Sequence, residues 1–161
     1  NPPEQVAAAL VPLLEQTDLK DQVRAVSIEW LAALVVLVKE RTKTLVEMVH
    51  WVKPYFGETV VIEEEAAKKF LTPAQAPMLT KVTERFEAFP SFAKQAWEEA
   101  FKKVVEEEGI KMGQLAQPVR VALTGRTASP GLFEVMEVLG RERTLLRLRK
   151  AIEHAAGSSQ S

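Results

Sequence analysis

Cysteine is absent from this chain of 161 residues, and histidine occurs only as His50 and His154. Without cysteine there is no disulfide framework and no cysteine-ligated zinc site, and this composition is typical of a reducing compartment. The two histidines lie far apart and have no ligand spacing around them. The sequence therefore predicts no metal site.

Long apolar stretches are also missing. The longest, Trp30–Val38, has nine residues, whereas a membrane-spanning helix needs about 20. The N-terminus lacks the basic and apolar regions of a signal peptide. We therefore expect a soluble, cytoplasmic protein without a membrane partner. Because the first residue is Asn1 rather than Met, we also expect a fragment of a longer chain.

Catalytic signatures are absent too. No nucleophile stands in a recognisable triad motif, and the chain contains neither a Walker loop nor a GxGxxG loop. The acidic runs Glu63–Glu65 and Glu106–Glu108 are typical of solvated faces. The sequence accordingly predicts no catalytic residue.

Charge is distributed unevenly along the chain. The net charge of −1 argues against a general nucleic-acid binder. Residues 1–109 carry 13 Lys and Arg against 18 Asp and Glu, whereas residues 110–161 carry 8 against 4. A basic C-terminal third is what a local RNA-binding surface needs. Chance produces the same bias in a chain that is 27% charged.

The apolar residues recur mainly at helical spacing, which predicts an all-α fold. Thr44 and Glu47 fit a capping box at the start of one helix. Trp97 and Phe101 lie on an apolar stripe, so they are expected in the core rather than as platforms for base stacking. Before the last segment of the chain, the helices are expected over residues 2–17, 21–41, 44–55, 63–71, 72–86 and 90–109.

The segment 111–150 is expected to form three short helices. Gly125 should end the first in a left-handed cap, Ser129 should cap the second with Pro130 as its first residue, and Gly140 should end it. The third is basic. We expect its outward-facing residues to be Arg143, Arg147 and Lys150.

The loop Gly125–Ser129 leads to a predicted helix N-terminus, where unpaired N–H groups and the positive end of the helix dipole face outward. Such a site suits a phosphate or the acceptor edge of a base. An ordinary helix–loop–helix corner has the same sequence pattern, so both interpretations stay open.

The run QPVRVALTG, followed by SPGLFEVMEVLGRERTLLRL, closely resembles the C-terminal signature of bacterial glutamyl-tRNA synthetases, which are class I aminoacyl-tRNA synthetases. The similarity extends from Gly113 to about Leu148, with a weaker match towards the N-terminus. The resemblance implies an all-α anticodon-binding domain of two packed helical subdomains, of the α-helix cage type. We assign them to residues 1–60 and 61–156, with a disordered tail at 157–161.

The resemblance also implies a set of contacts with RNA. Arg41, in the run ERTKTL, is similar to a basic residue that contacts the third anticodon base, with Lys43 as the alternative and a solvated turn as the other interpretation. The positions that match the pocket for the first and second bases are Arg120, Ser129, Pro130 and Leu132. The candidate phosphate contacts are Lys43, Arg126, Arg143, Arg147 and Arg149. For Arg147 and Arg149, a solvated helix face explains the sequence equally well.

By this resemblance, the chain would read the anticodon of tRNA(Glu) as part of an ATP-dependent glutamate–tRNA ligase. ATP, Mg and glutamate would bind an N-terminal catalytic domain of the same protein, and residues 1–161 would hold no cofactor and be inactive alone. We expect a monomer. An arginine at position 41 favours an enzyme that discriminates between glutamate and glutamine tRNAs. The alternative is a helical protein–protein interaction module.

Overall fold

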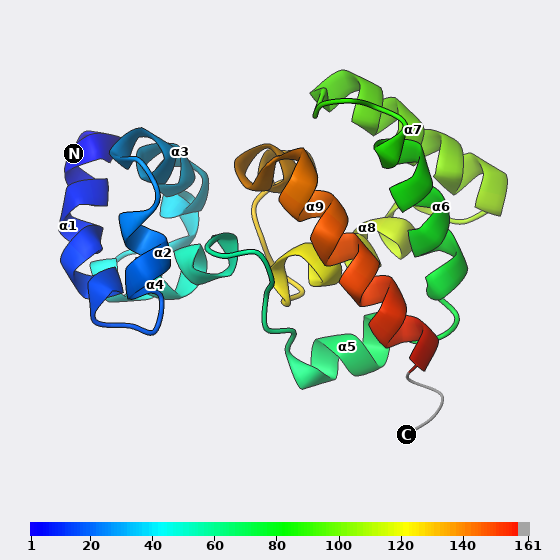
Figure 1. The fold of residues 1–161 in the computed structure, drawn as a ribbon, viewed down its shortest axis with the longest axis horizontal. Helices are drawn as coiled ribbons and strands as arrows, with labels where there is room; N and C mark the ends of the chain where they lie inside the picture. The colour runs from blue at the N-terminus through cyan, green and yellow to red at the C-terminus, as the bar shows by residue number, and fades with distance from the viewer. Residues whose placement is uncertain (158–161) are drawn as a thin grey trace. The chain divides into compact units, whose positions relative to one another are not determined.

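The computed structural model describes residues 1–157, and these contain helices but no strand. They fall into two compact units that meet between Gly57 and Glu58, drawn in blue to cyan and in green to red (Figure 1). The predicted disordered tail lies outside the described residues, except for Gly157, which ends the last helix. No helix within residues 1–157 has the length and apolar character needed to cross a membrane.

The first unit is built around α1, which packs against α3 and α4. Its core consists of apolar side chains from these helices, including Leu10, Leu34 and Val52, each fully buried. Its elements are α1 (Pro3–Glu15), α2 (Lys20–Arg24), α3 (Ile28–Val38), the 3₁₀ turn η1 (Lys39–Arg41), α4 (Leu45–Val52) and the 3₁₀ turn η2 (Lys53–Tyr55).

The prediction of one continuous helix over residues 21–41 is wrong. The chain leaves the helix after Arg24, and the Ser27 hydroxyl accepts a hydrogen bond from the Trp30 N–H at 3.0 Å, so a new helix begins at Ile28. A serine favours this position because it satisfies one of the unpaired N–H groups of the first turn. The predicted Thr44 cap is confirmed, since its hydroxyl accepts from the Glu47 N–H at 3.1 Å.

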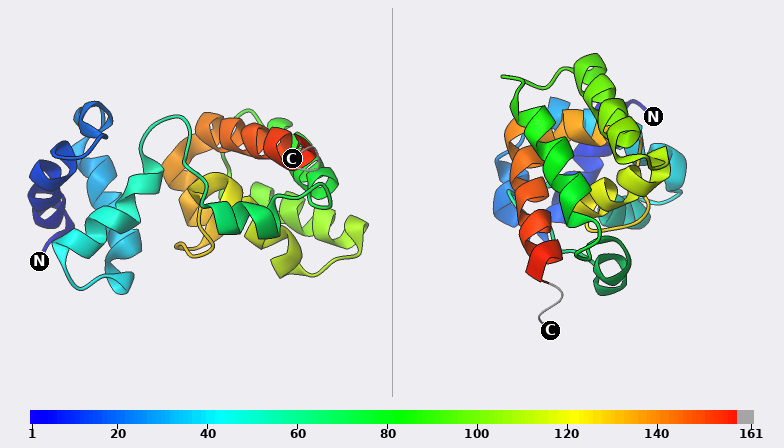
Figure 2. Two further views of the ribbon diagram at one scale, coloured as in Figure 1. Left: turned by 90° about the horizontal axis from the view of Figure 1, so that it is seen from below. Right: turned by 90° about the vertical axis from the view of Figure 1, so that its right-hand side faces the viewer.

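The second unit is organised by its last helix, α9, which packs against α6 and α8. α9 and α6 lie side by side in Figure 1 and in the right-hand view of Figure 2. Trp97 and Phe101 are buried, as predicted, and the Trp97 ring stacks on Phe86 with centroids 4.1 Å apart. The helices are α5 (Glu64–Phe70), α6 (Ala76–Glu87), α7 (Lys94–Glu108), α8 (Met112–Thr124) and α9 (Leu132–Gly157).

The backbone of α9 is broken at Gly140, where φ is 81° and ψ is 167°. The predicted end of a helix at this glycine is confirmed, and its extended ψ differs from that of a left-handed cap. This region of backbone space is open to glycine almost alone. The chain can therefore change direction at one residue and start the basic segment at once.

Candidate nucleic-acid interface

The corner between α8 and α9 is fixed by Gly125. This residue adopts the predicted left-handed cap, with φ of 75°, and its N–H donates to the Val121 carbonyl at 2.8 Å. Its own carbonyl accepts from the Glu63 N–H at 2.8 Å. A Cβ atom here would lie 2.0 Å from the Val61 carbonyl oxygen. Glycine is thus required both by the backbone angle and by the segment before α5, which lies directly against the corner.

The second half of the corner differs from the sequence prediction. α9 begins at Leu132, and the Val135 N–H donates to the Gly131 carbonyl at 3.0 Å, so Gly131 stands at the N-cap position. The predictions of Ser129 as the cap and Pro130 as the first helical residue are therefore wrong by two positions. Ser129 instead hydrogen-bonds within the corner: its hydroxyl donates to the Pro130 carbonyl at 2.7 Å.

Arg120, on α8, reaches the same serine. Its Nε–H donates to the Ser129 hydroxyl oxygen at 2.8 Å, and one terminal N–H group donates to the Gln117 side-chain oxygen. The Gln117 amide in turn donates to the Thr127 carbonyl at 3.2 Å. Arg120 is half-buried, while Ser129 and Pro130 are buried. A short chain of hydrogen bonds therefore ties the loop to the face of α8.

The structure thus brings together the residues that the resemblance assigned to one pocket. Arg120 and Ser129 are in direct contact, and Leu132, 7% exposed, follows Pro130 in the first turn of α9. Sequence reasoning missed Gln117. The signal that could have found it is its position three residues before Arg120, which places both on one face of a helix.

The negative charge of Glu134 affects which kind of ligand can bind at the corner. It lies in the first turn of α9, and a Cβ atom at Gly131 would lie 2.6 Å from one of its carboxylate oxygens. A carboxylate is favourable at the positive end of a helix dipole. Because this carboxylate already stands beside the helix N-terminus, it would repel a phosphate there. The arrangement is better suited to the edge of a base.

The predicted outward orientation of Arg147 is wrong. The residue is 2% exposed. One terminal N–H group donates to the Leu123 carbonyl at 2.7 Å, and Nε–H donates to the Glu58 carbonyl at 3.3 Å. A guanidinium in this position is out of reach of a phosphate. Arg149, by contrast, is exposed and forms an ion pair with Glu87.

Arg141 and Arg143 show the same behaviour as Arg147. Arg141 donates to the Phe89 carbonyl at 2.7 Å, just beyond the end of α6. The half-buried Arg143 donates to the Leu139 carbonyl at 3.0 Å, where the first part of α9 ends. Burial lowers the pKa of Arg143, although the Glu58 carboxylate opposes the shift; an arginine stays charged at neutral pH regardless.

Arg141, Arg143 and Arg147 all donate to backbone carbonyls at or near the ends of helices, which the charge pattern of the sequence did not predict. The last turn of a helix leaves carbonyl groups without partners and carries the negative end of the dipole. The basic part of α9 supplies cationic donors to three such ends, those of α6, α8 and its own first part. Its positive charge therefore stabilises the fold, and Arg143 and Arg147 are poor candidates for phosphate contacts.

The remaining cationic candidates lie nearer the surface. Arg126 is half-buried and follows the Gly125 cap, where its N–H donates to the Thr124 hydroxyl at 3.2 Å. Arg41 ends the turn η1, and both Arg41 and Lys43 are exposed. The guanidinium carbon of Arg41 lies 5.8 Å from the centre of the Trp51 ring. Sequence reasoning missed Trp51.

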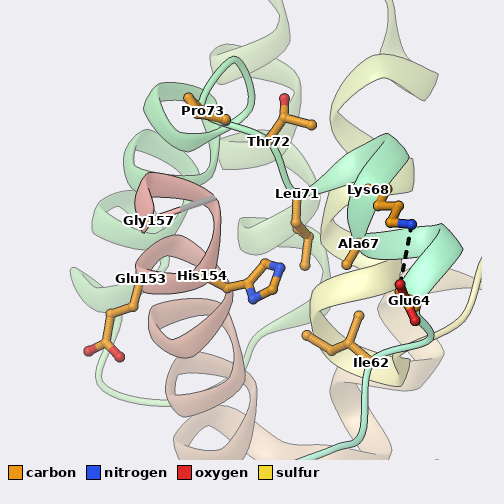
Figure 3. Close-up of a pocket in the computed structure, with 10 residues that line it drawn as sticks. All are labelled: Ile62, Glu64, Ala67, Lys68, Leu71, Thr72, Pro73, Glu153, His154 and Gly157. Carbon is orange, nitrogen blue, oxygen red and sulfur yellow. Dashed lines mark ion pairs between the residues drawn. The ribbon is translucent and has the colours of Figure 1, made fainter. Parts of the chain in front are cut away.

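Two hollows in the second unit are lined in part by residues of α5. One, of about 390 Å³, adjoins the corner and is lined by Gln117 and Thr127 together with residues of α5. The other, of about 820 Å³, lies between α5 and the end of α9 (Figure 3). The His154 imidazole points into it, and the Glu64–Lys68 ion pair stands at its rim. None of the predicted RNA contacts lines this second hollow.

The sequence matches a family model that is described as an anticodon binding domain. The match extends over residues 5–152. Because it covers most of the chain, the chain belongs to the anticodon-binding-domain family.

The relatives identify the enzymes in which this domain occurs. The chain is 37% identical to the glutamate–tRNA ligase of Thermodesulfovibrio yellowstonii and 41% identical to that of Geobacter sulfurreducens, each over 152 residues. Each alignment covers 94% of this chain, and 33% and 32% of the respective relatives. The chain therefore spans about a third of their length. The predicted resemblance to glutamyl-tRNA synthetases is confirmed.

A solved structure supports the same assignment. The glutamate–tRNA ligase of Elizabethkingia meningosepticum is similar in fold, with a TM-score of 0.74 and 28% sequence identity. The similarity covers 91% of this chain and 29% of the ligase. The predicted all-helical anticodon-binding fold is confirmed by this likeness.

Proposed function

We propose that this chain recognises the anticodon of tRNA(Glu) as the C-terminal part of a glutamate–tRNA ligase. The observation that carries the proposal is the hydrogen bond of 2.8 Å between Arg120 and Ser129. It joins two positions of the family signature at one corner of the fold. The family match over residues 5–152 and the ligase relatives support it.

The corner suits base recognition because its polar groups are arranged in advance. Unstacked RNA bases are read on their hydrogen-bonding edges, while phosphate contacts add affinity. The Ser129 hydroxyl is oriented by Arg120 and by the Pro130 carbonyl, so little ordering remains to be paid on binding. In the proposed complex, these groups contact the first two anticodon bases and Leu132 supplies an apolar wall.

The third base is assigned to Arg41. A guanidinium donates to O2 and N3 of cytosine, whereas guanine presents N–H donors on the same edge. This difference separates glutamate from glutamine tRNAs, so the proposal includes a discriminating enzyme. Lys43, two residues further along an exposed turn, is the alternative donor.

The rest of the reaction is assigned to chain outside this domain. The ligase relatives are about three times as long as the aligned segment. We assign ATP, Mg and glutamate to an N-terminal catalytic domain of the same protein, and no cofactor or catalytic residue to residues 1–157. The proposed protein is a cytoplasmic monomer.

An electrophoretic shift assay tests the proposal. It measures the affinity of the chain for a glutamate tRNA transcript and for the same transcript with an exchanged anticodon. Arg120→Ala is expected to weaken binding to the first by about 1–3 kcal/mol, since a guanidinium in the base pocket is lost. Lys103→Ala, which removes an exposed cation from α7 of the same unit, is the matched control and should change binding little.

Equal affinity of the unsubstituted chain for the two transcripts would contradict the proposal and favour a protein-binding module. If Arg120→Ala and Lys103→Ala changed the affinity for tRNA equally, the chain would still bind RNA, but the corner would not be the site that recognises the anticodon.

A further inference from the structure

Arg41 is exposed on a short turn, yet its side chain rests against an aromatic ring. The guanidinium carbon lies 5.8 Å from the centre of the Trp51 ring, and cations within about 6 Å of a ring face are attracted to it. Trp51 is half-buried on α4, and the His50 ring meets it edge-on with centroids 6.3 Å apart. The indole that Arg41 contacts is therefore partly enclosed, and it is carried by α4 rather than by the turn that holds Arg41.

Such a contact affects how an arginine recognises a ligand. A long exposed side chain adopts many rotamers, and ordering them opposes binding. A cation–ring contact restrains the side chain through its attraction to the ring face. A guanidinium restrained in this way loses less freedom on meeting a base. The benefit reaches only a base whose edge offers acceptors to the N–H groups.

We propose that Trp51 is a positioning residue for recognition of the third anticodon base, acting by holding the Arg41 guanidinium ready for the acceptor edge of a cytosine. This inference rests on the proposed function, and within it on Arg41 as the third-base contact. A purely structural role for Trp51 would change the stability of the first unit and would lower affinity for all tRNAs alike. A positioning role changes the ratio between tRNAs that differ at one base.

The experiment measures dissociation constants of the chain for two glutamate tRNA transcripts, one with cytosine and one with guanine at the third anticodon position. Trp51→Leu is expected to reduce the preference for cytosine about two- to fivefold, the range that follows from an exposed cation–ring contact. Trp51→Phe, which retains a ring, is expected to recover part of the preference. In a chain that already carries Arg41→Gln, Trp51→Leu is expected to have no further effect on the ratio.

Circular dichroism of each variant establishes that it is folded, and Trp51→Met replaces Trp51→Leu if the latter is not. An unchanged ratio in the folded ring-less variant overturns the inference, as does an undiminished effect of Trp51→Leu in the Arg41→Gln chain. If Arg41→Gln leaves the ratio unchanged while Arg120→Ala still weakens binding, the Trp51 inference is overturned and recognition at the corner stands. If the affinity of the unsubstituted chain does not depend on the anticodon at all, both the Trp51 inference and the proposed function are overturned.

Discussion

The guanidinium groups of Arg147 and Arg149 stand two residues apart on α9 in opposite surroundings. The first is 2% exposed and donates to the carbonyls of Leu123 and Glu58, while the second is exposed and paired with a carboxylate. Burying a charged group costs free energy unless its hydrogen bonds are satisfied. The Leu123 and Glu58 carbonyls accept hydrogen bonds from Arg147 and offset part of that cost, whereas an exposed ion pair contributes little.

This contrast predicts different effects of the same substitution. Arg147→Met keeps much of the volume but leaves the Leu123 carbonyl without its donor, so we expect a loss of about 1–3 kcal/mol in the free energy of unfolding. Arg149→Met is the control, with an expected change within about 0.5 kcal/mol. Urea unfolding followed by circular dichroism measures both. Equal effects would mean that the buried hydrogen bonds of Arg147 add nothing to stability.

Helix ends, rather than helix faces, set the shape of the candidate site. α8 ends at Gly125, whose carbonyl is bonded to Glu63, and α9 begins only after a buried Ser129–Pro130 pair. The cap at Gly125 therefore controls two things at once, the end of one helix and the approach of the segment before α5. Gly109, which ends α7 with φ of 63°, has the same kind of backbone angle, but a Cβ atom there would meet no other atom within 4 Å.

The two glycines provide a matched pair of substitutions. Gly109→Ala should cost about 1–2 kcal/mol, the strain of a left-handed residue with a Cβ atom. Gly125→Ala should cost more, because its Cβ atom would also lie 2.0 Å from the Val61 carbonyl oxygen. It should in addition weaken tRNA binding, since the corner must move. Thermal unfolding and the tRNA shift assay test both expectations. Equal losses of stability in the two variants would show that the Val61 segment can move away from a Cβ atom without a loss of free energy.

The charge of the whole chain gives a misleading picture of where RNA would bind. The excess of arginine after residue 110 suggested a basic surface, but Arg141, Arg143 and Arg147 all donate to backbone carbonyls. Among the candidate contacts, Arg126 lies in the loop after α8, and Arg41 and Lys43 lie in the turn after α3, in different units of the chain. The exposed Arg149 is paired with Glu87. We therefore expect few phosphate contacts and only a moderate dependence of binding on salt.

The salt dependence of tRNA binding tests the remaining candidate at the corner. If Arg126 contacts a phosphate, Arg126→Ala should reduce the slope of log K against log salt concentration by about 0.7–0.9, because one fewer counterion is released. Lys103→Ala, on α7, should leave the slope unchanged. Titrations at several salt concentrations measure both, and parallel lines for Arg126→Ala and the unsubstituted chain would remove Arg126 from the phosphate contacts.

Sequence by itself determined the helical fold, the family, the caps at Thr44 and Gly125, and the buried position of Trp97. The family follows from the signature between Gly113 and Leu148. The helices, the caps and the burial of Trp97 depend on residues within one or two turns of a helix, where periodicity and capping chemistry act directly. The break before Ile28 had a local signal as well, in Ser27. It was hidden by the nearly continuous apolar run that follows.

Only the tertiary structure decided which way the arginines of α9 face. Thr144, Leu148 and Ala151 mark the buried face at helical spacing, and Arg147 lies among them. The sequence does not indicate that this face is buried, because Thr144 and Ala151 are residue types that are also common at the surface. What makes an arginine stable there is the Leu123 carbonyl in the last turn of α8, a helix more than 20 residues earlier in the chain, together with the Glu58 carbonyl. The same holds for Ser129 and Trp51, whose partners come from another helix or turn and are brought near only by folding.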